Sequence, residues 1–587
     1  MVVFWKDILK AGAIVLAIAL LNLVGFIEYS RIDLTENGAH SLTPGFVQLL
    51  EDDLDHNMYI RVYLSGNDFP AQVENLRRNV EDKLIEFNHL SSGKVKYEFI
   101  DPEEDPELAE DLKIELEKAG LSEKSYSVLI KNKPVDIPFW PGAIIDYGLD
   151  KTSAIQFVTG GMESVDPFTL NLASDQLEYK FLQTFRKLTR DAYPKVGFLQ
   201  GHGELPENST ISIRGHLKEY YDVEYFSLKD SAGRVLFNPK TDSTGKTSFR
   251  ALKDYKSIVI AQPKSSFSNG EKFIIDQFIM NGGKVAWLVD ALDMREDSLF
   301  MTGQSFALPY ELNISDMLFN YGARLNNDLV LSSNCGPIWD FRKNQPAEWN
   351  FYVLARNSNR DPVASNLNPV KMKYASSVEP VGDTSIRKRI LLESSQESRV
   401  FKSPARVALA YIDPAYRPKY IGNGVEKRPL AVMLEGRFKS FFRNSLDPAY
   451  KDSIVLKKES VPNKMLVIGD GDIIENRIHP KKVNKVKIEE TDVLSPDHEV
   501  IVSAPNPIPM YDNIDFFKNA FDDLMEEDNL ISLRGREFKQ RPLNEKIVSN
   551  ENSRNTLKFI NVALPILILL IFGSIQYVVR KRKFAKP

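Results

Sequence analysis

The chain has 587 residues, with 75 Lys and Arg against 80 Asp and Glu, so its formal net charge is −5 at pH 7. A chain of this length exceeds one hydrophobic core, and we expect about three domains of roughly 150 residues each. The acidic balance argues against nucleic acid as a partner, because phosphate binding needs an excess of Lys and Arg. Cys335 is the single cysteine, which excludes an intrachain disulfide and a zinc site made of several thiolates.

An apolar stretch over residues 8–27 predicts a transmembrane helix, because about 20 such residues span a bilayer. A cleaved signal peptide is the alternative, since Lys6 and Lys10 stand near the start of the stretch. The stretch is long for a signal peptide, and no small-residue cleavage site follows it. We therefore expect an uncleaved anchor, preceded by a cytoplasmic N-terminus over residues 1–7.

Small residues in this predicted helix offer a face for packing against another membrane helix. Ala13 and Ala17 are four residues apart, a spacing that allows close approach, and the Asn22 amide favours a polar partner within the lipid. Contact with lipid alone is the alternative, because small residues are common in membrane helices.

A second apolar stretch predicts a transmembrane helix over residues 557–579, and a basic tail follows over residues 580–587. Basic flanks stay in the cytoplasm, so we expect a cytoplasmic C-terminus and, after two spans, a cytoplasmic N-terminus. A large ectodomain without disulfides is typical of a bacterial periplasmic domain. We therefore predict a two-pass protein of the bacterial inner membrane with a periplasmic ectodomain.

A first α/β domain is predicted over residues 28–170. Strand patterns at residues 58–64 and 95–100 alternate with helix patterns at 73–87 and 106–119. The resulting β-α-β-α order favours a small α/β fold.

A second α/β domain is predicted over residues 171–337. A long amphipathic helix at 174–189 leads into a strand at 195–200, and mostly apolar strand patterns follow at 257–261 and 282–289. Such strands between helices are typical of a doubly wound parallel sheet that is covered on both faces.

Residues 338–556 are predicted as a third, strand-rich α/β region, with a late strand at 464–468 and a helix at 514–525. No G-x-x-x-x-G-K-[ST] loop occurs in the sequence. Coupling to ATP hydrolysis through such a loop therefore requires another subunit.

The sharpest candidate site is a ligand-binding loop, Gly201-His202-Gly203-Glu204. It follows the first strand of its domain, and ligands of open α/β sheets bind beyond the carboxyl ends of strands. His202 and Glu204 could then serve acid–base chemistry or bind a ligand. The alternative, which we favour, is a glycine turn whose polar groups satisfy loop amides. No nucleophile accompanies the loop, because the comparable turn at residues 289–293 has neither Ser nor Cys.

The second candidate site is a carboxylate turn formed by Asp470 and Asp472 after the strand at 464–468. Paired carboxylates at a strand end can hold Mg²⁺ or Ca²⁺, but Asp-Gly is also a common turn without chemistry, and we favour the turn. None of the seven histidines lies at H-x-x-x-H or H-E-x-x-H spacing. The sequence therefore predicts no catalytic residue, no resident metal and no cofactor.

Six segments, taken in order along the chain, resemble one known family: RIDLT at 31–35, SLTP at 41–44, GHGE at 201–204, GG at 282–283, LEGRF at 434–438 and VIGDGD at 467–472. This family is GldG, the auxiliary or substrate-binding component associated with gliding-motility ABC transporters of Bacteroidota. The resemblance covers essentially the whole chain, including both predicted membrane helices.

The resemblance implies two partners, a polytopic permease, GldF, and a cytoplasmic ATPase, GldA. It also implies that residues 171–337 form an amidotransferase-like sheet without the nucleophile, and it carries over no catalytic residue. We therefore expect a non-enzymatic, membrane-anchored auxiliary subunit of an ABC transporter that contacts a substrate or an envelope component. A mechanical or scaffolding component of the motility apparatus and a periplasmic hydrolase are the alternatives.

Overall fold

The computed structural model describes residues 42–525, with internal gaps, and residues 551–584. The gaps are 67–68, 106, 108, 131–132, 159–163, 191, 230–238, 242–246, 250–251, 341, 358–360, 366, 421–423, 445–455, 479–492 and 500–507. The chain divides into two units, Met1–Arg536 and Glu537–Pro587, and each unit is described by itself.

The first α/β region contains a four-stranded mixed sheet and a separate hairpin. Its elements are α2 (Pro44–Glu51), β1 (Met58–Val62), α3 (Ala71–Leu90), β2 (Val95–Phe99), α4 (Ala109–Lys118), β3 (Lys124–Ile130), β4 (Lys133–Phe139), β5 (Gly142–Tyr147) and β6 (Lys151–Gln156). The sheet has the order β2-β1-β5-β6, with β1 and β2 parallel and the other pairs antiparallel. β3 and β4 form the hairpin. The predicted order of β1, α3, β2 and α4 is confirmed.

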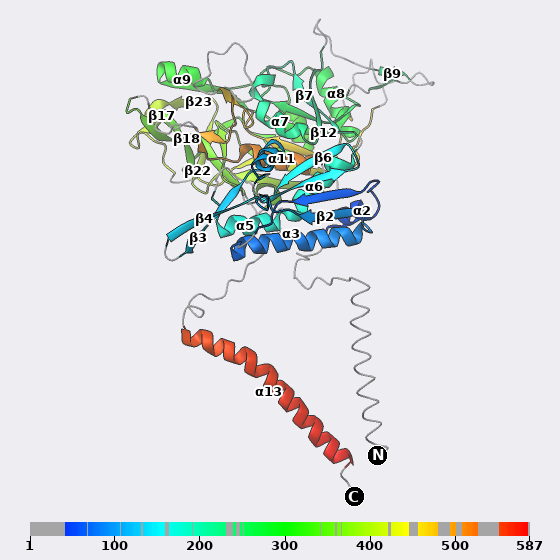
Figure 1. Cartoon of the computed structure of the whole chain (residues 1–587). Helices are drawn as coiled ribbons and strands as arrows, with labels where there is room; N and C mark the ends of the chain where they lie inside the picture. Colours follow the sequence, from blue (N-terminus) through cyan, green and yellow to red (C-terminus); the bar gives the residue numbers. More distant parts are fainter. Residues whose placement is uncertain are drawn as a thin grey trace. The chain divides into compact units, whose positions relative to one another are not determined.

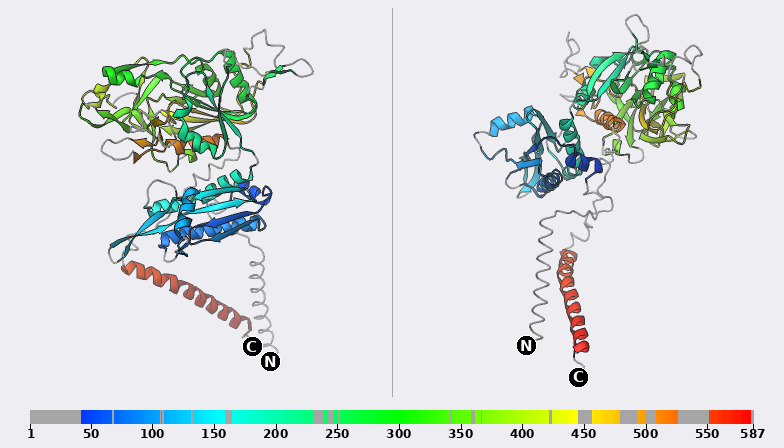
Figure 2. Two further views of the ribbon diagram at one scale, coloured as in Figure 1. Left: turned by 45° about the horizontal axis from the view of Figure 1, so that its top comes forward. Right: turned by 90° about the vertical axis from the view of Figure 1, so that its right-hand side faces the viewer.

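The helix α3 covers the small sheet because its apolar residues recur every three or four positions. Val73, Leu76, Val80, Leu84 and Phe87 are all fully buried and belong to one core with β1. Residues at this spacing form one stripe along a helix. Figure 2 (left) shows α3 lying along the strands of this sheet.

Two helices, α5 (Pro167–Asp175) and α6 (Leu177–Thr189), stand where the sequence predicted one helix from residue 174. The break falls at Gln176. α5 was not predicted as a separate helix. It starts at Pro167 because the Asp166 side chain accepts a hydrogen bond of 2.7 Å from the Thr169 N–H, and Pro167 suits the first turn.

A ten-stranded sheet forms the centre of the rest of this unit. Five neighbouring strands in it are parallel, in the order β8 (Asp222–Ser227), β7 (Lys195–Gln200), β11 (Tyr255–Ala261), β12 (Lys284–Leu288) and β25 (Asn463–Ile468). α7 (Ile211–Lys218) lies between β7 and β8 in the chain, and α8 (Asn269–Met280) lies between β11 and β12. The chain thus winds outward in both directions from β7 and β11, as expected for a doubly wound sheet.

The other half of the sheet is antiparallel, so the sheet is mixed and extends beyond the doubly wound parallel domain predicted over residues 171–337. It consists of β24 (Pro429–Gly436), β21 (Arg387–Glu393), β18 (Gln345–Asn357), β17 (Cys335–Asp340) and β19 (Val370–Lys373). β25 pairs with β12 on one side and with β24 on the other. The boundary expected at residue 338 therefore cuts through one sheet. Local periodicity could not show this, because it reports burial and not the pairing partner.

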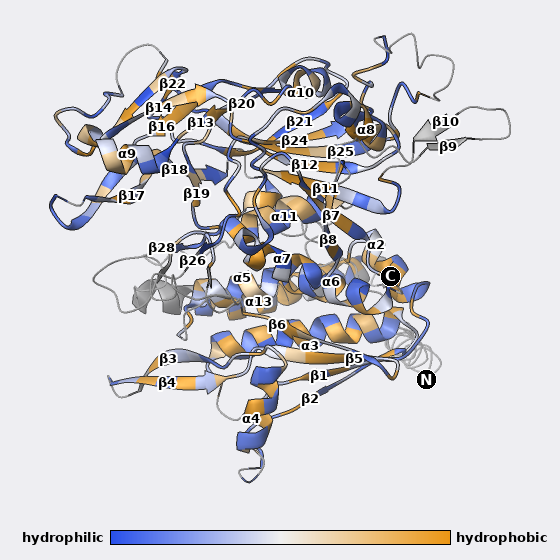
Figure 3. Ribbon diagram, turned by 90° about the horizontal axis from the view of Figure 1, so that it is seen from above, coloured by the Kyte–Doolittle hydropathy of each residue, from blue (hydrophilic) through white to orange (hydrophobic). Residues whose placement is uncertain are grey.

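Alternate residues of the central strands enter two separate cores. Val259 belongs to the core that contains α7 and α11 (Asn513–Met525), whereas its neighbour Ile258 belongs to the core that contains α8 and α10 (Ser315–Tyr321). Successive side chains of a strand point to opposite faces, so helices cover both faces of the sheet. Figure 3 shows the hydrophobic strands β12 and β25 side by side within it.

Short elements complete this unit. They are η1 (Glu207–Ser209), β9 (Pro239–Thr241), β10 (Thr247–Phe249), β13 (Leu292–Asp293), α9 (Glu296–Thr302), β14 (Gln304–Pro309), β15 (Ala323–Leu325), β16 (Asp328–Ser332), η2 (Pro362–Ala364), β20 (Val378–Pro380), β22 (Ser398–Lys402), β23 (Ala405–Ala408), η3 (Leu409–Ile412), β26 (Arg477–Ile478), β27 (Val493–Leu494), β28 (His498–Glu499) and β29 (Ile508–Pro509). The strands among them form small two- and three-stranded sheets.

In the second unit the described residues form one helix, α13 (Glu551–Phe584), which continues through Pro565 and is drawn in red in Figure 1. Its segment Lys558–Val579 has a mean hydropathy of 2.4 and is long and apolar enough to cross a membrane. This agrees with the helix predicted over residues 557–579.

The first predicted membrane helix, over residues 8–27, lies outside the described residues. The same holds for the proposed packing face of Ala13, Ala17 and Asn22. The two-pass topology therefore stays a prediction.

Candidate functional site

The carboxyl ends of parallel strands meet at one edge of the ten-stranded sheet, which we call the carboxyl edge. β7 is followed by Gly201–Glu204, β11 by Gln262, β12 by Asp290 and β25 by Asp470. Open α/β sheets bind ligands beyond this edge. Both candidate loops of the sequence analysis therefore lie where a binding site would be expected.

His202 is enclosed within this edge. It is 1% exposed, and its ring stacks on Phe267 with 3.9 Å between the ring centroids. Its Nδ1 lies 3.0 Å from Glu204 Oε1, and its Nε2 lies 2.9 Å from Glu271 Oε1. The main-chain N–H of His202 also donates to Glu204 Oε2 at 2.6 Å. Both ring nitrogens are thus engaged by carboxylates.

Glu271 reaches His202 from the first turn of α8, where it forms a capping box with Ser268. The Glu271 N–H donates to Ser268 Oγ at 3.4 Å, and Glu271 Oε2 accepts from the Ser268 N–H at 2.9 Å. Its other oxygen, Oε1, faces His202 and lies 2.9 Å from Lys229 Nζ. Sequence reasoning missed Glu271, although S-x-x-E before an apolar run is a signal for a helix start.

The carboxylates hold His202 in its charged form. Burial lowers the pKa of His202, but hydrogen bonds to Glu204 and Glu271 outweigh burial and raise this pKa to about 9. Burial raises the pKa of Glu271, but hydrogen bonds from His202, Ser268 and Lys229 outweigh it and lower this pKa to about 2. An imidazolium that donates from both nitrogens has no lone pair left to accept a proton. In this geometry His202 ties the loop after β7 to α8 and cannot act as a general base.

Gly201 and Gly203 shape the loop that turns Glu204 back onto His202. Their φ angles are +120° and +82°, in a region that other residues enter only at a cost in free energy. The two glycines therefore allow the backbone conformation of this loop.

We expect the His202 network to stabilise the protein less in alkali. The folded-state pKa of about 9 exceeds the ordinary 6.5, so this stabilisation is complete below pH 6.5 and is lost as pH rises through 9. The His202→Gln variant should therefore be less stable than the native protein by roughly 3 kcal/mol near pH 6, with a much smaller difference near pH 10. The apparent Tm of both full-length proteins in mild detergent measures the difference.

Acid should affect the same network only at much lower pH. The contribution of Glu271 is complete above its ordinary pKa of 4.5 and is lost as pH falls towards 2. A difference in stability that stays constant between about pH 6 and pH 10 would contradict a charged His202.

Asp290 lies after β12 at the carboxyl edge and accepts hydrogen bonds from two neighbouring loops. Its Oδ1 accepts from the Gly471 N–H at 2.7 Å, and its Oδ2 accepts from Gln262 Nε2 at 3.0 Å. Asp290 thereby connects the loops after β11, β12 and β25, and both of its oxygens are used within the protein.

Asp470 turns inward, whereas Asp472 stays partly exposed, with 19% of its side chain accessible. Asp470 is fully buried, and its Oδ2 accepts from the Lys373 N–H at 2.7 Å while its Oδ1 accepts from the Asp472 N–H at 3.1 Å. Lys373 Nζ lies 3.6 Å from Asp472 Oδ2. Lys373 of β19 therefore holds the predicted carboxylate turn in place. No motif in the sequence connects β19 with this turn.

Three neighbouring carboxyls cannot all ionise in this buried setting. Burial and the charge of Asp472 raise the pKa of Asp290 to about 7, and the same two causes raise the pKa of Asp470 well above its ordinary range. Burial also raises the pKa of Asp472, but the charge of Lys373 and a hydrogen bond from Asp470 outweigh it and lower this pKa. Burial and the neighbouring charges thus favour the protonated form of Asp470 and the charged form of Asp472 beside Lys373.

The space left at this turn is small. A cavity of about 20 Å³ is lined by Lys371, Lys373, Asp472, Glu475, Arg477, Pro496, His498 and Asn513. Such a volume holds about one water molecule. An organic substrate does not fit there in this structure.

The two candidate loops share an edge, but the structure does not bring their side chains into one site. The ring nitrogens of His202 contact Glu204 and Glu271. Asp470 accepts a hydrogen bond from the Lys373 N–H, and Asp472 lies beside the Lys373 ammonium group. Across the described ranges, no group of three or more His, Cys, Asp or Glu side chains could hold a metal ion.

Residues 193–495 match the family described as "ABC-type uncharacterized transport system", whose members are auxiliary components. The chain belongs to this family. The matched residues contain the whole ten-stranded sheet and both candidate loops, so the chain is an auxiliary component of an ABC-type transport system. Residues 36–146 match a domain of unknown function, DUF7088.

No curated protein matches the sequence of this chain. Among solved structures, the chain is similar to one described as "mmIFT52 N-terminal domain", at 12% identity and a TM-score of 0.27, with 48% of this chain and 88% of that chain covered. A likeness at this level carries no argument about function.

Proposed function

We propose that this auxiliary component is a non-enzymatic subunit, anchored in the bacterial inner membrane at both ends, that presents its α/β region in the periplasm. Its partners would be a GldF-like permease and a GldA-like ATPase, and its role would be in gliding motility. Membership of the transport family and the apolar segment of α13 support this proposal.

The proposal that this subunit is not an enzyme rests on the contacts of the polar side chains at the carboxyl edge. A hydrolase needs a free nucleophile or base beside a space for the substrate. His202 uses both ring nitrogens, and Asp290 and Asp470 each use both oxygens, within the protein. These contacts favour a binding or scaffolding subunit over a periplasmic hydrolase.

Because a chain with two membrane helices cannot line a transport path, its association with a permease is the property to test. We expect a permease and an ATPase to co-purify with the tagged full-length chain from native membranes in mild detergent. Replacing Lys558–Val579 with an unrelated apolar helix of equal length should reduce their recovery, because helix packing in lipid depends on shape and small residues. Quantitative mass spectrometry of the purified complex measures the recovery.

The His202→Gln variant is the matched control, since it alters the ectodomain and leaves α13 intact. Its recovery of the permease should equal that of the native chain at neutral pH. Recovery that does not depend on the sequence of α13 would make this helix a passive tether. A native chain that captures no permease would favour the alternative, a scaffolding component of the motility apparatus.

A further inference from the structure

The first α/β domain contains a cavity of about 580 Å³. It lies where the parallel strands β1 and β2 end, since Ser65 and Phe69 follow β1 and Asp101 follows β2. The end of β4 forms another wall with Phe139 and Trp140. Ligand pockets commonly measure about 300–1,000 Å³ and occur at the carboxyl ends of parallel strands.

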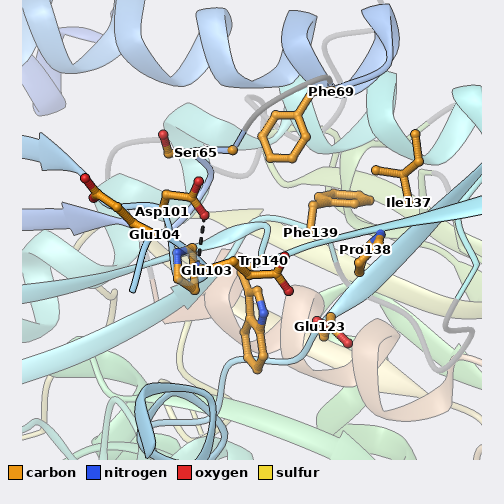
Figure 4. Close-up of a pocket in the computed structure, with 12 residues that line it drawn as sticks. Ser65, Phe69, Asp101, Glu103, Glu104, Glu123, Ile137, Pro138, Phe139 and Trp140 are labelled. Carbon is orange, nitrogen blue, oxygen red and sulfur yellow. Dashed lines mark hydrogen bonds between the residues drawn. The ribbon is translucent and has the colours of Figure 1, made fainter. Parts of the chain in front are cut away.

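Three aromatic rings give this cavity firm walls. Phe139 and Trp140 are 3% and 4% exposed, so packing fixes their positions. The rings of Phe69 and Phe139 stand edge to face with 6.4 Å between their centroids. Figure 4 shows Phe69, Phe139 and Trp140 around the space, with the carboxylates of Asp101 and Glu104 on the side opposite Phe139.

The charge around the cavity has one sign. Four carboxylates line it, those of Asp101, Glu103, Glu104 and Glu123, and no Lys, Arg or His is among the lining residues. Lys113 Nζ pairs with Glu103 at 3.0 Å, and Asp101 Oδ1 accepts from the Glu103 N–H at 3.0 Å, whereas Glu104 and Glu123 are exposed residues in the lining. An anion would be repelled here, whereas a cation would be attracted.

A buried donor without a partner lies behind one wall of this cavity. The indole nitrogen of Trp140 has no hydrogen-bond partner among the described residues, although it is shielded from solvent. Buried polar groups normally have a partner. In Figure 4 this nitrogen lies on the side of the indole that faces Glu123, another lining residue.

The geometry points to a binding site for an organic cation in this cavity, with an ammonium group held by the carboxylates and an apolar body packed on the aromatic rings. The faces of Phe and Trp rings attract cations. This site is separate from the carboxyl edge of the large sheet and does not depend on the transporter partners.

Benzoylcholine is a suitable probe, because it combines a permanent ammonium charge with an aromatic body. Its counterpart is benzoylglycine, which carries the same benzoyl body and a negative charge. Saturation-transfer NMR titrations with the full-length protein in mild detergent should give a dissociation constant at least tenfold lower for benzoylcholine. Equal binding of the two probes would overturn the proposal.

Variants of the lining residues locate the binding. The double variant Glu104→Gln, Glu123→Gln keeps the shape of two exposed side chains and should weaken benzoylcholine binding roughly tenfold. Phe69→Leu should weaken it several-fold by removing one aromatic face. The control Glu110→Gln, Glu117→Gln removes two exposed charges of α4 that do not line the cavity, and it should bind as the native protein does.

Two further outcomes would contradict an organic-cation site. Native affinity in the Glu104→Gln, Glu123→Gln variant would show that the probe binds elsewhere. Displacement of benzoylcholine by millimolar Ca²⁺, combined with no effect of Phe69→Leu, would indicate a metal site made of carboxylates instead.

Discussion

Replacing Arg389 with alanine should lower the free energy of unfolding by about 3–5 kcal/mol, because it leaves buried carboxylates without their common cation. Arg389 Nη2 lies 2.7 Å from Asp361 Oδ1, and Nη1 lies 2.6 Å from Glu435 Oε1 and 2.8 Å from Asp523 Oδ2. The Asp523 side chain is fully buried. An apparent Tm roughly 10 °C lower for the full-length variant in mild detergent would correspond to this loss.

The effect should extend to α11, because Asp523 belongs to this helix. Without Arg389, Lys464 Nζ at 2.7 Å is the remaining cation on Asp523 in the described structure. Hydrogen exchange should therefore be faster in α11 of the variant than in the native protein. Protection that is unchanged in α11 would show that other contacts suffice to hold the helix.

The matched control is Arg387→Ala on the same strand. Arg387 is 67% exposed, and the described structure shows it paired with Glu435 at 3.2 Å. Exposed pairs contribute at most about 1 kcal/mol, so this variant should remain close to the native protein. Equal losses in both variants would contradict the role assigned to burial.

Replacing Gly469 with alanine should destabilise the sheet by more than about 3 kcal/mol, because two backbone segments cross there without space for a methyl group. A Cβ at this position would lie 2.0 Å from the Ser376 carbonyl oxygen and 2.9 Å from Val378 Cγ2. The Ser376 N–H donates to the Gly469 oxygen at 2.7 Å, so relief of the clash would break this contact. Thermal unfolding of the full-length protein measures the effect.

Gly336 is the control for this prediction, since neither glycine has a positive φ and only Gly469 is crowded. A Cβ at Gly336 would meet its nearest atom, Tyr511 Oη, at 3.4 Å, which is an ordinary contact. Gly336→Ala should therefore cost less than about 1 kcal/mol. A mild effect of Gly469→Ala would mean that β25 and the segment around Ser376 can separate easily.

The individual helices and strands were largely predictable from the sequence. The strand at 195–200 and the helix α11 follow the predicted limits closely, because their apolar residues recur with the period of the element. α5 was missed because its start depends on the cap by Asp166 rather than on periodicity.

The candidate site was only partly predictable. His202 and Glu204 are two residues apart, and so are Asp470 and Asp472, so each pair was visible as a local pattern. The partners that decide their chemistry, Glu271 for His202 and Lys373 for Asp472, come from other elements. A histidine with both nitrogens engaged cannot be distinguished from a reactive one without these contacts.

By itself, the sequence determined properties that depend on neighbouring residues along the chain: the apolar segment of α13, the alternation of helices and strands, and the absence of a P-loop. Only the tertiary structure decided which strands pair. β12 and β25 are adjacent although more than 170 residues separate them, and this pairing assembles the carboxyl edge. Local periodicity records which face of an element is buried, whereas the partner is selected by packing across the whole core.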